Sequence, residues 1–235
     1  MDDWCYKHYI RWVLVKFGKM LRLMMMELKR MKVLNLYAGI GGNRKLWEDV
    51  EVVSVESNPE IAIIYKDFYP KDNLVIGDAH EYLLKHFSEF DFIWSSPPCP
   101  THSRVRIYSK NMKEGLIDPV YPDMKLYEEI ILLKHYFKGK YVVENVIGYY
   151  EPLIRPQEMD RHYFWANFHI SNRDFSTQDI VNIKKDDEVF GFNISKYNLS
   201  SDYNHVKVLR NCVNPYLGLH IFNESKIDIQ SHLFT

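Results

Sequence analysis

The sequence predicts an α/β protein, built on a mostly parallel mixed sheet with helices on both faces. Two observations predict this class: short apolar runs alternate with segments of helical periodicity from residue 32 onward, and glycine or proline clusters such as AGIGG and PPCP end some of the runs. Strands that alternate with helices of this length are typical of parallel sheets. The 235 residues, 46% of them apolar, allow one domain with a small addition and exclude disordered, collagenous and solenoid classes.

The elements follow in order along the chain. Strands are predicted at 32–37, 50–56, 73–77, 90–96, 141–146 and 162–170. Helices are predicted at 58–68, 79–87 and 122–137, the last with a proline near its first turn, and 205–222 predicts a loop leading into a helix. Ligands of such sheets bind at the carboxyl ends of the strands, and the unusual sequences of this chain occupy those ends.

Composition restricts the function classes. Three widely spaced cysteines form neither a disulfide framework nor a zinc knuckle and favour a reducing, intracellular setting. No apolar run is long enough to cross a membrane, and residues 1–30 lack the pattern of a signal peptide. The balance of 30 Lys and Arg against 31 Asp and Glu argues mildly against a nucleic-acid partner, since such domains usually carry a basic excess.

A glycine cluster marks the first candidate site. Gly39, Gly41 and Gly42 follow the first strand, where they let the backbone turn sharply and approach a ligand, and we expect a helix N-terminus with free N–H groups after them. Glu56 ends the second strand, where it could bind ribose hydroxyls, and Asp78 follows the third, where it could take an adenine amino group. A tight turn that merely needs glycine is the alternative. No Gly-Lys-Ser/Thr follows, so this is not a Walker loop.

A cysteine and an acid end two further strands. Cys99 lies among three prolines, which hold a nucleophilic thiol at the mouth of the sheet; the alternative is a buried, inert cysteine. Glu144 ends the fifth strand, where it could bind a ring nitrogen and share its proton, or else cap the next element.

Together these motifs resemble the DNA cytosine 5-methyltransferases. The matching segments, in family order, are YAGIGG at 37–42, Glu56, GDA at 77–79, PC at 98–99, ENV at 144–146, PQEMDR at 156–161 and NCVNP at 211–215. The resemblance covers about 32–167 and 205–222. The chain departs from the family at Pro100, where glutamine is usual, at Met159, where an arginine is usual, and in a late recognition block reduced to Gly191-Phe192.

The resemblance implies a Rossmann-like S-adenosylmethionine-dependent methyltransferase fold with a minimal target-recognition insertion. It implies addition of a cysteine thiolate to carbon 6 of a flipped cytosine and methyl transfer to carbon 5. The implied catalytic residues are Cys99, Glu144 and Arg161. The implied cofactor-binding residues are Tyr37, Gly39, Gly41, Gly42, Glu56, Asp78, Ala79, Pro98, Asn211 and Val213. The implied substrate-binding residues are Asn145, Gln157, Arg104 and Arg106.

On this interpretation the chain has four regions. We expect a basic helical extension at 1–31, a catalytic domain at 32–167, a reduced target-recognition region at 168–204 and a C-terminal segment at 205–235 that returns to the catalytic domain. The expected cofactor is S-adenosyl-L-methionine and the expected partner is double-stranded DNA, with no metal and no membrane. We expect a cytoplasmic monomer of a bacterium or of a phage-infected cell, with a cognate restriction endonuclease as a candidate partner.

Three alternatives stay open. An RNA cytosine methyltransferase shares the fold, because one branch of the family acts on tRNA. An exocyclic-amino methyltransferase would use Ser96-Pro97-Pro98, but its motif places an aromatic residue where Cys99 stands. A catalytically dead binding protein would be expected to lose Cys99 or Glu144, and both are present.

The charge is distributed unevenly. Residues 168–204 hold six acids and four bases, whereas residues 1–30 hold seven bases and three acids and residues 97–120 hold four bases and two acids. We therefore expect the N-terminal segment and the loop after Cys99 to supply much of the affinity for phosphate.

Overall fold

The structure is a computed structural model that describes residues 12, 16, 17, 30–108, 118–175, 184, 188–200 and 204–231. The chain divides into two compact units, Met1–Met31 and Lys32–Thr235. In the first unit the three described residues before residue 30 are helical, and Lys16 Nζ lies 4.2 Å from the centroid of the Trp12 ring.

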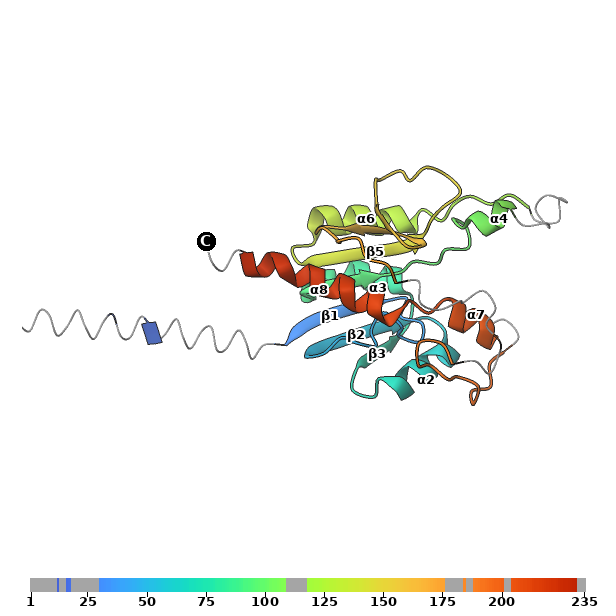
Figure 1. Cartoon of the computed structure of the whole chain (residues 1–235), viewed down its shortest axis with the longest axis horizontal. Helices are drawn as coiled ribbons and strands as arrows, with labels where there is room; N and C mark the ends of the chain where they lie inside the picture. Colours follow the sequence, from blue (N-terminus) through green and yellow to red (C-terminus); the bar gives the residue numbers. More distant parts are fainter. Residues whose placement is uncertain are drawn as a thin grey trace, which may run out of the picture. The chain divides into compact units, whose positions relative to one another are not determined.

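The second unit is built on a seven-stranded sheet (Figure 1) with the strand order β3-β2-β1-β4-β5-β7-β6. The strands are β1 (Met31–Leu36), β2 (Val50–Glu56), β3 (Asn73–Ile76), β4 (Phe92–Ser95), β5 (Lys140–Val146), β6 (Gln157–Met159) and β7 (His162–Ala166). The pairs β1–β4, β2–β3 and β4–β5 are parallel, and β7 is antiparallel to both β5 and β6. The predicted α/β class with a mostly parallel mixed sheet is confirmed.

Helices cover both faces of the sheet (Figure 1). α3 (Ala79–His86) and α6 (Lys125–Tyr136) pack on one face, where Leu34, Leu36 and Ile93 belong to the same buried cluster as Leu83 and Leu133. The opposite face meets α8 (Pro215–Ser231), whose Phe222 ring contacts Phe92 of β4 and Trp47. Alternate residues of β4, Phe92 and Ile93, therefore enter different cores, as the two-residue period of a strand requires.

α2 (Pro59–Phe68) shows why the sequence starts a helix there. The Asn58 side chain accepts hydrogen bonds from the N–H groups of Glu60 and Ile61, and Pro59 occupies the first helical turn, where its missing N–H is not needed. Ile61 and Ile64 bury the inner face of this helix.

The expectation of a helix directly after the glycine turn was wrong. Residues 42–46 form consecutive turns, in which Lys45 N–H bonds to Gly42 C=O and Trp47 N–H to Arg44 C=O. Buried side-chain contacts hold this segment instead of a helical ladder: Asn43 Nδ2 donates to Asn35 Oδ1 at 2.7 Å, and Arg44 bonds to Asp72 and to Trp47 C=O.

Other boundaries also differ from prediction. The last strand ends at Ala166 rather than at residue 170. Beyond it, the Asn167 side chain accepts from Tyr141 N–H and donates to Gly139 C=O, so these backbone groups bond to a side chain and not to a continued strand. Within the described part of the chain, four short elements were not predicted: β6, α4 (Arg104–Tyr108), the 3₁₀ turn η1 (Phe87–Glu89) and α7 (His205–Arg210), which precedes α8.

Residues 188–200 pack against the rest of the second unit. Val189, Phe192 and Ile194 are fully buried in a cluster with Ile40 and Ile64. Two of the polar groups in this segment, the Tyr197 hydroxyl and the Ser200 N–H, bond to carboxylates of α2. No helix among the described residues has the length and apolar character needed to span a membrane.

Candidate active site

A pocket of about 640 Å³ lies at the carboxyl ends of β1, β2, β4 and β5. Parallel neighbours bring these ends to one edge of the sheet, and this is where an open α/β sheet binds its ligands. Eleven of the residues selected from sequence line the pocket: Tyr37, Gly39, Gly42, Glu56, Pro98, Cys99, Glu144, Asn145, Arg161, Asn211 and Val213.

The glycine turn brings backbone to the pocket wall. Gly39 has a φ of +55°, and no atom lies within 4 Å of the position that a Cβ would take there. Its N–H donates to Glu56 Oε2 at 2.9 Å, and the second oxygen of Glu56 accepts from Asn58 N–H at 2.9 Å. Glu56 therefore joins the turn after β1 to the start of α2 and holds its carboxylate at the pocket.

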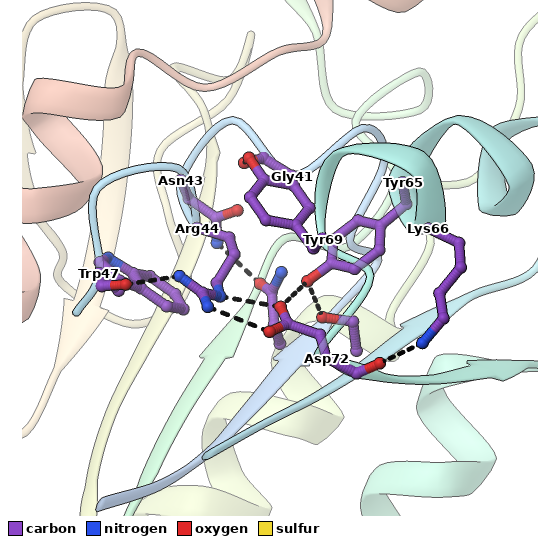
Figure 2. Close-up of polar contacts among 10 residues, drawn as sticks. Gly41, Asn43, Arg44, Trp47, Tyr65, Lys66, Tyr69 and Asp72 are labelled. Carbon is purple, nitrogen blue, oxygen red and sulfur yellow. Dashed lines mark hydrogen bonds and ion pairs between the residues drawn. The ribbon is translucent and has the colours of Figure 1, made fainter. Parts of the chain in front are cut away.

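A polar network lies behind this turn (Figure 2). The Tyr69 hydroxyl donates to Gly41 C=O at 2.7 Å, and Arg44 makes two hydrogen bonds to the Asp72 carboxylate, which also accepts from the Tyr65 hydroxyl. A Cβ at Gly41, whose φ is +82°, would collide with the rings of Tyr65 and Tyr69. The role of Gly41 in this structure is thus to let α2 approach the turn, and it does not line the pocket.

Cys99 lies in the pocket at the end of β4, partly buried. Burial raises the pKa of its thiol above the ordinary cysteine value, and the negative charge of Glu144 raises this pKa further, while a backbone hydrogen bond lowers it. The loop around it is fixed at both ends: Asn145 Nδ2 donates to Pro97 C=O at 2.9 Å, and Cys99 C=O accepts from the N–H groups of His102 and Ser103.

Glu144 reaches the same pocket from β5, the parallel neighbour of β4. The residue is 7% exposed, and its Oε1 lies 3.6 Å from His162 Nε2. Arg161 immediately precedes β7 and lines the pocket, and its C=O accepts from Ile147 N–H at 3.3 Å. Cys99, Glu144 and Arg161 therefore come from three segments to line one cavity.

Five further predicted site residues lie outside the pocket lining. Asp78 caps α3 by accepting from Glu81 N–H, and Ala79 beside it is buried. Gln157 bonds through both ends of its amide to the backbone of Phe168 and Ile170.

The other two are arginines of α4. Arg104 Nε donates to Gly148 C=O at 3.0 Å, and an Arg106 Nη donates to Asp118 C=O at 2.8 Å. Arg104 is exposed and Arg106 is half-buried, and both hold the loop after Cys99 against neighbouring backbone in this structure.

Several pocket residues were not selected from sequence. They include His162, Phe175, Phe190, Lys207 and Arg210. The position of His162 next to Arg161 was an available signal. The other four residues lie in or next to polar or short segments, and no local sequence pattern predicts that these segments reach the pocket.

The chain matches the family described as C-5 cytosine-specific DNA methylase over residues 31–149. No curated sequence is significantly similar to it.

Solved structures similar to the chain include a DNMT2 mutant of Spodoptera frugiperda (20% identity, 61% of this chain and 53% of that one, TM-score 0.40). Others are a SAM-dependent methyltransferase of Agrobacterium tumefaciens (15% identity, 52% and 40%, TM-score 0.36) and a hypothetical protein of Thermus thermophilus (17% identity, 71% and 85%, TM-score 0.39).

The family match spans half of the chain and includes the glycine turn, the Cys99 loop and the end of β5, and the sheet is that of a Rossmann-like methyltransferase. The cofactor of such an enzyme is S-adenosyl-L-methionine. The chain therefore belongs to the family of C-5 cytosine-specific DNA methylases.

Proposed function

We propose that the protein methylates carbon 5 of cytosine in DNA, acting on a base flipped out of the duplex. The observation that carries this proposal is the joint presence of Cys99 and Glu144 in one pocket, with the glycine turn and Glu56 lining the same pocket. Cys99 lies in the loop that follows β4, and Glu144 lies on β5, the parallel neighbour of β4. A nucleophile for carbon 6 and an acid for the ring nitrogen are thereby supplied beside a cofactor site.

The residues fit S-adenosyl-L-methionine. The open space at Gly39 lets the cofactor approach the backbone, Glu56 presents a carboxylate suited to ribose hydroxyls, and 640 Å³ lies within the range of ligand pockets. We assign Tyr37, Gly42, Pro98, Asn211 and Val213 to the same cofactor wall, since all line this pocket. When bound, the cofactor supplies a methyl group on an electrophilic sulfonium.

The chemistry of the chain follows from its side chains. The Cys99 sulfur adds to carbon 6 of cytosine, which makes carbon 5 nucleophilic. Glu144 holds nitrogen 3 and shares its proton, and Arg161 pairs with the oxygen on carbon 2, where negative charge develops. After carbon 5 has gained the methyl group, its proton passes to water, the electrons of the C5–H bond form the C5–C6 double bond, and the sulfur–carbon 6 bond breaks to release the Cys99 thiolate.

Asn145 acts on the base indirectly, through the loop that carries Cys99. Its side chain holds Pro97 C=O, and this bond fixes the start of the loop that carries Cys99. Asn145 is 2% exposed, so the position of the thiol relative to Glu144 is set by a buried contact between β5 and the end of β4.

Cationic side chains around the pocket favour a nucleic acid as the substrate. Arg161, Lys207 and Arg210 line it, and all three are exposed. A flipped base carries a phosphate on either side, and guanidinium and ammonium groups bind phosphate oxygens. Duplex DNA must open for the thiol to reach carbon 6, and unstacking the base takes a few kcal/mol that such contacts can offset.

The test uses the full chain, S-adenosyl-L-methionine and duplex DNA with 5-fluorocytosine. Fluorine cannot leave carbon 5 as a proton does, so the protein should stay covalently attached to the DNA. Cys99→Ala should form no adduct and should not methylate ordinary DNA. Cys5→Ala is the matched control, and it should form the adduct and methylate ordinary DNA. Methylation by Cys99→Ala at the rate of the unaltered protein would rule out the covalent route.

The same assay separates DNA from RNA. Duplex DNA, single-stranded DNA and transfer RNA are offered at equal cytosine concentration. Methylation of the RNA alone would overturn the proposal of a DNA substrate and leave the assignment of Cys99 intact.

A further inference from the structure

A fully buried acid lies beneath the active-site edge and has no place in the reaction described above. Glu129 is on α6 with a relative exposure of 0%, on the same helix face as the buried residues Leu126, Ile130 and Leu133. A buried carboxylate is costly unless hydrogen bonds satisfy it, so its partners indicate what it holds.

Three side chains converge on this carboxylate. The Tyr37 hydroxyl donates to Glu129 Oε1 at 2.6 Å, and the Ser95 hydroxyl donates to Oε2 at 2.5 Å. His80 Nδ1 lies 3.0 Å from Oε1, while its Nε2 lies 3.2 Å from Oε2 of the exposed Glu128. Both Glu129 oxygens are thus engaged within the protein.

The partners come from the ends of three different strands, two of which end at the pocket. Tyr37 directly follows β1, Ser95 is the last residue of β4, and His80 stands in the first turn of α3 after β3. β1 and β4 are adjacent and pair Leu36 with Ser95. Glu129 therefore joins the strand that leads to the glycine turn with the strand that leads to Cys99.

The backbone at Tyr37 provides a second, independent observation. Its φ is +54°, in the left-handed region that non-glycine residues rarely adopt, and Tyr37 lines the pocket. Strained residues persist where surrounding contacts hold them, and they cluster at functional sites. Burial and the charge of Glu129 both raise the pKa of the Tyr37 hydroxyl, so it stays protonated and able to donate.

We propose that Glu129 is a positioning residue: it holds the strained Tyr37 at the cofactor pocket and locks the end of β4 in register with it. The cofactor and the nucleophile are then kept in a constant relation by one buried carboxylate. The part concerning Tyr37 rests only on the cofactor pocket, and the part concerning β4 rests also on the proposed role of Cys99.

Glu129→Gln tests the idea with little change of shape. The amide offers one acceptor oxygen where the carboxylate offers two, so the donor that faces its NH₂ group can no longer donate to residue 129. Tyr37→Phe removes only the hydroxyl and leaves the ring. Glu128→Gln is the matched control, since Glu128 is adjacent on α6 and its side chain is 62% exposed.

The first measurement is the dissociation constant for S-adenosyl-L-methionine, by calorimetry and without nucleic acid. We expect Glu129→Gln and Tyr37→Phe each to weaken binding roughly tenfold, the loss expected for one hydrogen bond. If both act through the same hydrogen bond, the double variant should bind about as weakly as Glu129→Gln alone. Glu128→Gln should bind as the unaltered protein does.

A purely structural role gives a different result. In that case the thermal midpoint of Glu129→Gln would fall while the folded protein bound the cofactor normally, and this outcome would overturn the proposal. Losses that multiply in the double variant, or normal binding by Tyr37→Phe, would overturn it as well. If Glu129→Gln does not fold, cofactor binding by Tyr37→Phe still tests the proposal.

The link to β4 has its own readout. Ser95→Ala should slow covalent trapping on 5-fluorocytosine DNA severalfold at saturating cofactor, with the cofactor dissociation constant unchanged. Normal trapping would reject this part of the proposal. Because cofactor binding is measured separately, failure of the DNA assignment would leave the Tyr37 test standing.

Discussion

Arg44 and Asp72 form a doubly hydrogen-bonded ion pair behind the glycine turn, with Nε–Oδ2 at 2.8 Å and Nη2–Oδ1 at 3.0 Å (Figure 2). Their side chains are 13% and 6% exposed. The pair ties the irregular segment after the glycines to the loop between α2 and β3. It provides a restraint that helical hydrogen bonds would otherwise supply.

Breaking this pair should destabilise the protein strongly. Asp72→Asn leaves the Arg44 charge poorly compensated in a nearly buried position, which costs about 3–5 kcal/mol. Urea unfolding measures the loss. The control is Glu81→Gln, which breaks the exposed Lys85–Glu81 pair at 3.3 Å and should cost at most about 1 kcal/mol. Equal losses in the two variants would contradict the ranking of buried over exposed pairs.

Two glycines of the turn should respond differently to alanine. Gly39→Ala meets open space in the pocket, so it should cost about 1–2 kcal/mol for its left-handed backbone and mainly weaken cofactor binding. Gly42→Ala would drive its methyl group into Val213 C=O and the Cys212 sulfur, so it should mainly lower the thermal midpoint. Melting curves and calorimetry on both variants test this. A reversed pattern would contradict the assignment of Gly39 to the cofactor wall.

The reactivity of Cys99 should rise with pH. Its thiolate is the reactive form, and burial and the charge of Glu144 hold the pKa of the thiol above its ordinary value of 9.0. Alkylation by iodoacetamide in the free protein should therefore increase through the alkaline range, with an inflection above that value. The experiment uses the Cys5→Ala variant, so that alkylation of Cys5 does not add to the signal. Cys212 should stay unmodified because burial raises the pKa of its thiol to about 12.

Glu144→Gln should move that inflection to lower pH, since it removes a charge that disfavours the thiolate. The same variant should reduce turnover by about 10²–10⁴-fold, the usual loss when a general acid is removed. An inflection that stays in place would mean that Glu144 does not act on the thiol.

The N-terminal segment should contribute to phosphate affinity. Residues 1–30 carry seven Lys and Arg against three acids. Replacing those seven by Gln should weaken DNA binding and flatten its dependence on salt, by about 0.9 in the log–log slope for each phosphate that is no longer neutralised. Fluorescence anisotropy between low and moderate salt measures the slope. An unchanged slope would assign the phosphate binding to other parts of the chain.

Prediction from sequence succeeded where a local pattern of residues determines the structure. The apolar runs that end at Leu36, Ser95 and Val146 are strands because buried parallel strands need continuous apolar residues, and their carboxyl ends meet at one edge. The glycines, the prolines around Cys99 and the acid at Glu144 stand out at those ends because each is unusual beside an apolar strand.

Prediction failed where contacts between segments far apart in the sequence determine the structure. Glu128 and Glu129 are neighbours on one helix, and only the fold makes the first exposed and the second fully buried. The β6 strand is three residues long, too short for a periodic signal, and exists because β7 pairs with it.

The sequence by itself determined the main strands and helices, the edge of the sheet at which the pocket forms and eleven of the residues that line it, because these depend on periodicity and residue type. The tertiary structure decided that irregular turns replace a helix after the glycines, that Asp78 and Gln157 bond within the protein, and that Glu129 joins Tyr37 to Ser95. These outcomes depend on which distant donors and acceptors are buried together, and burial is a property of the packed chain.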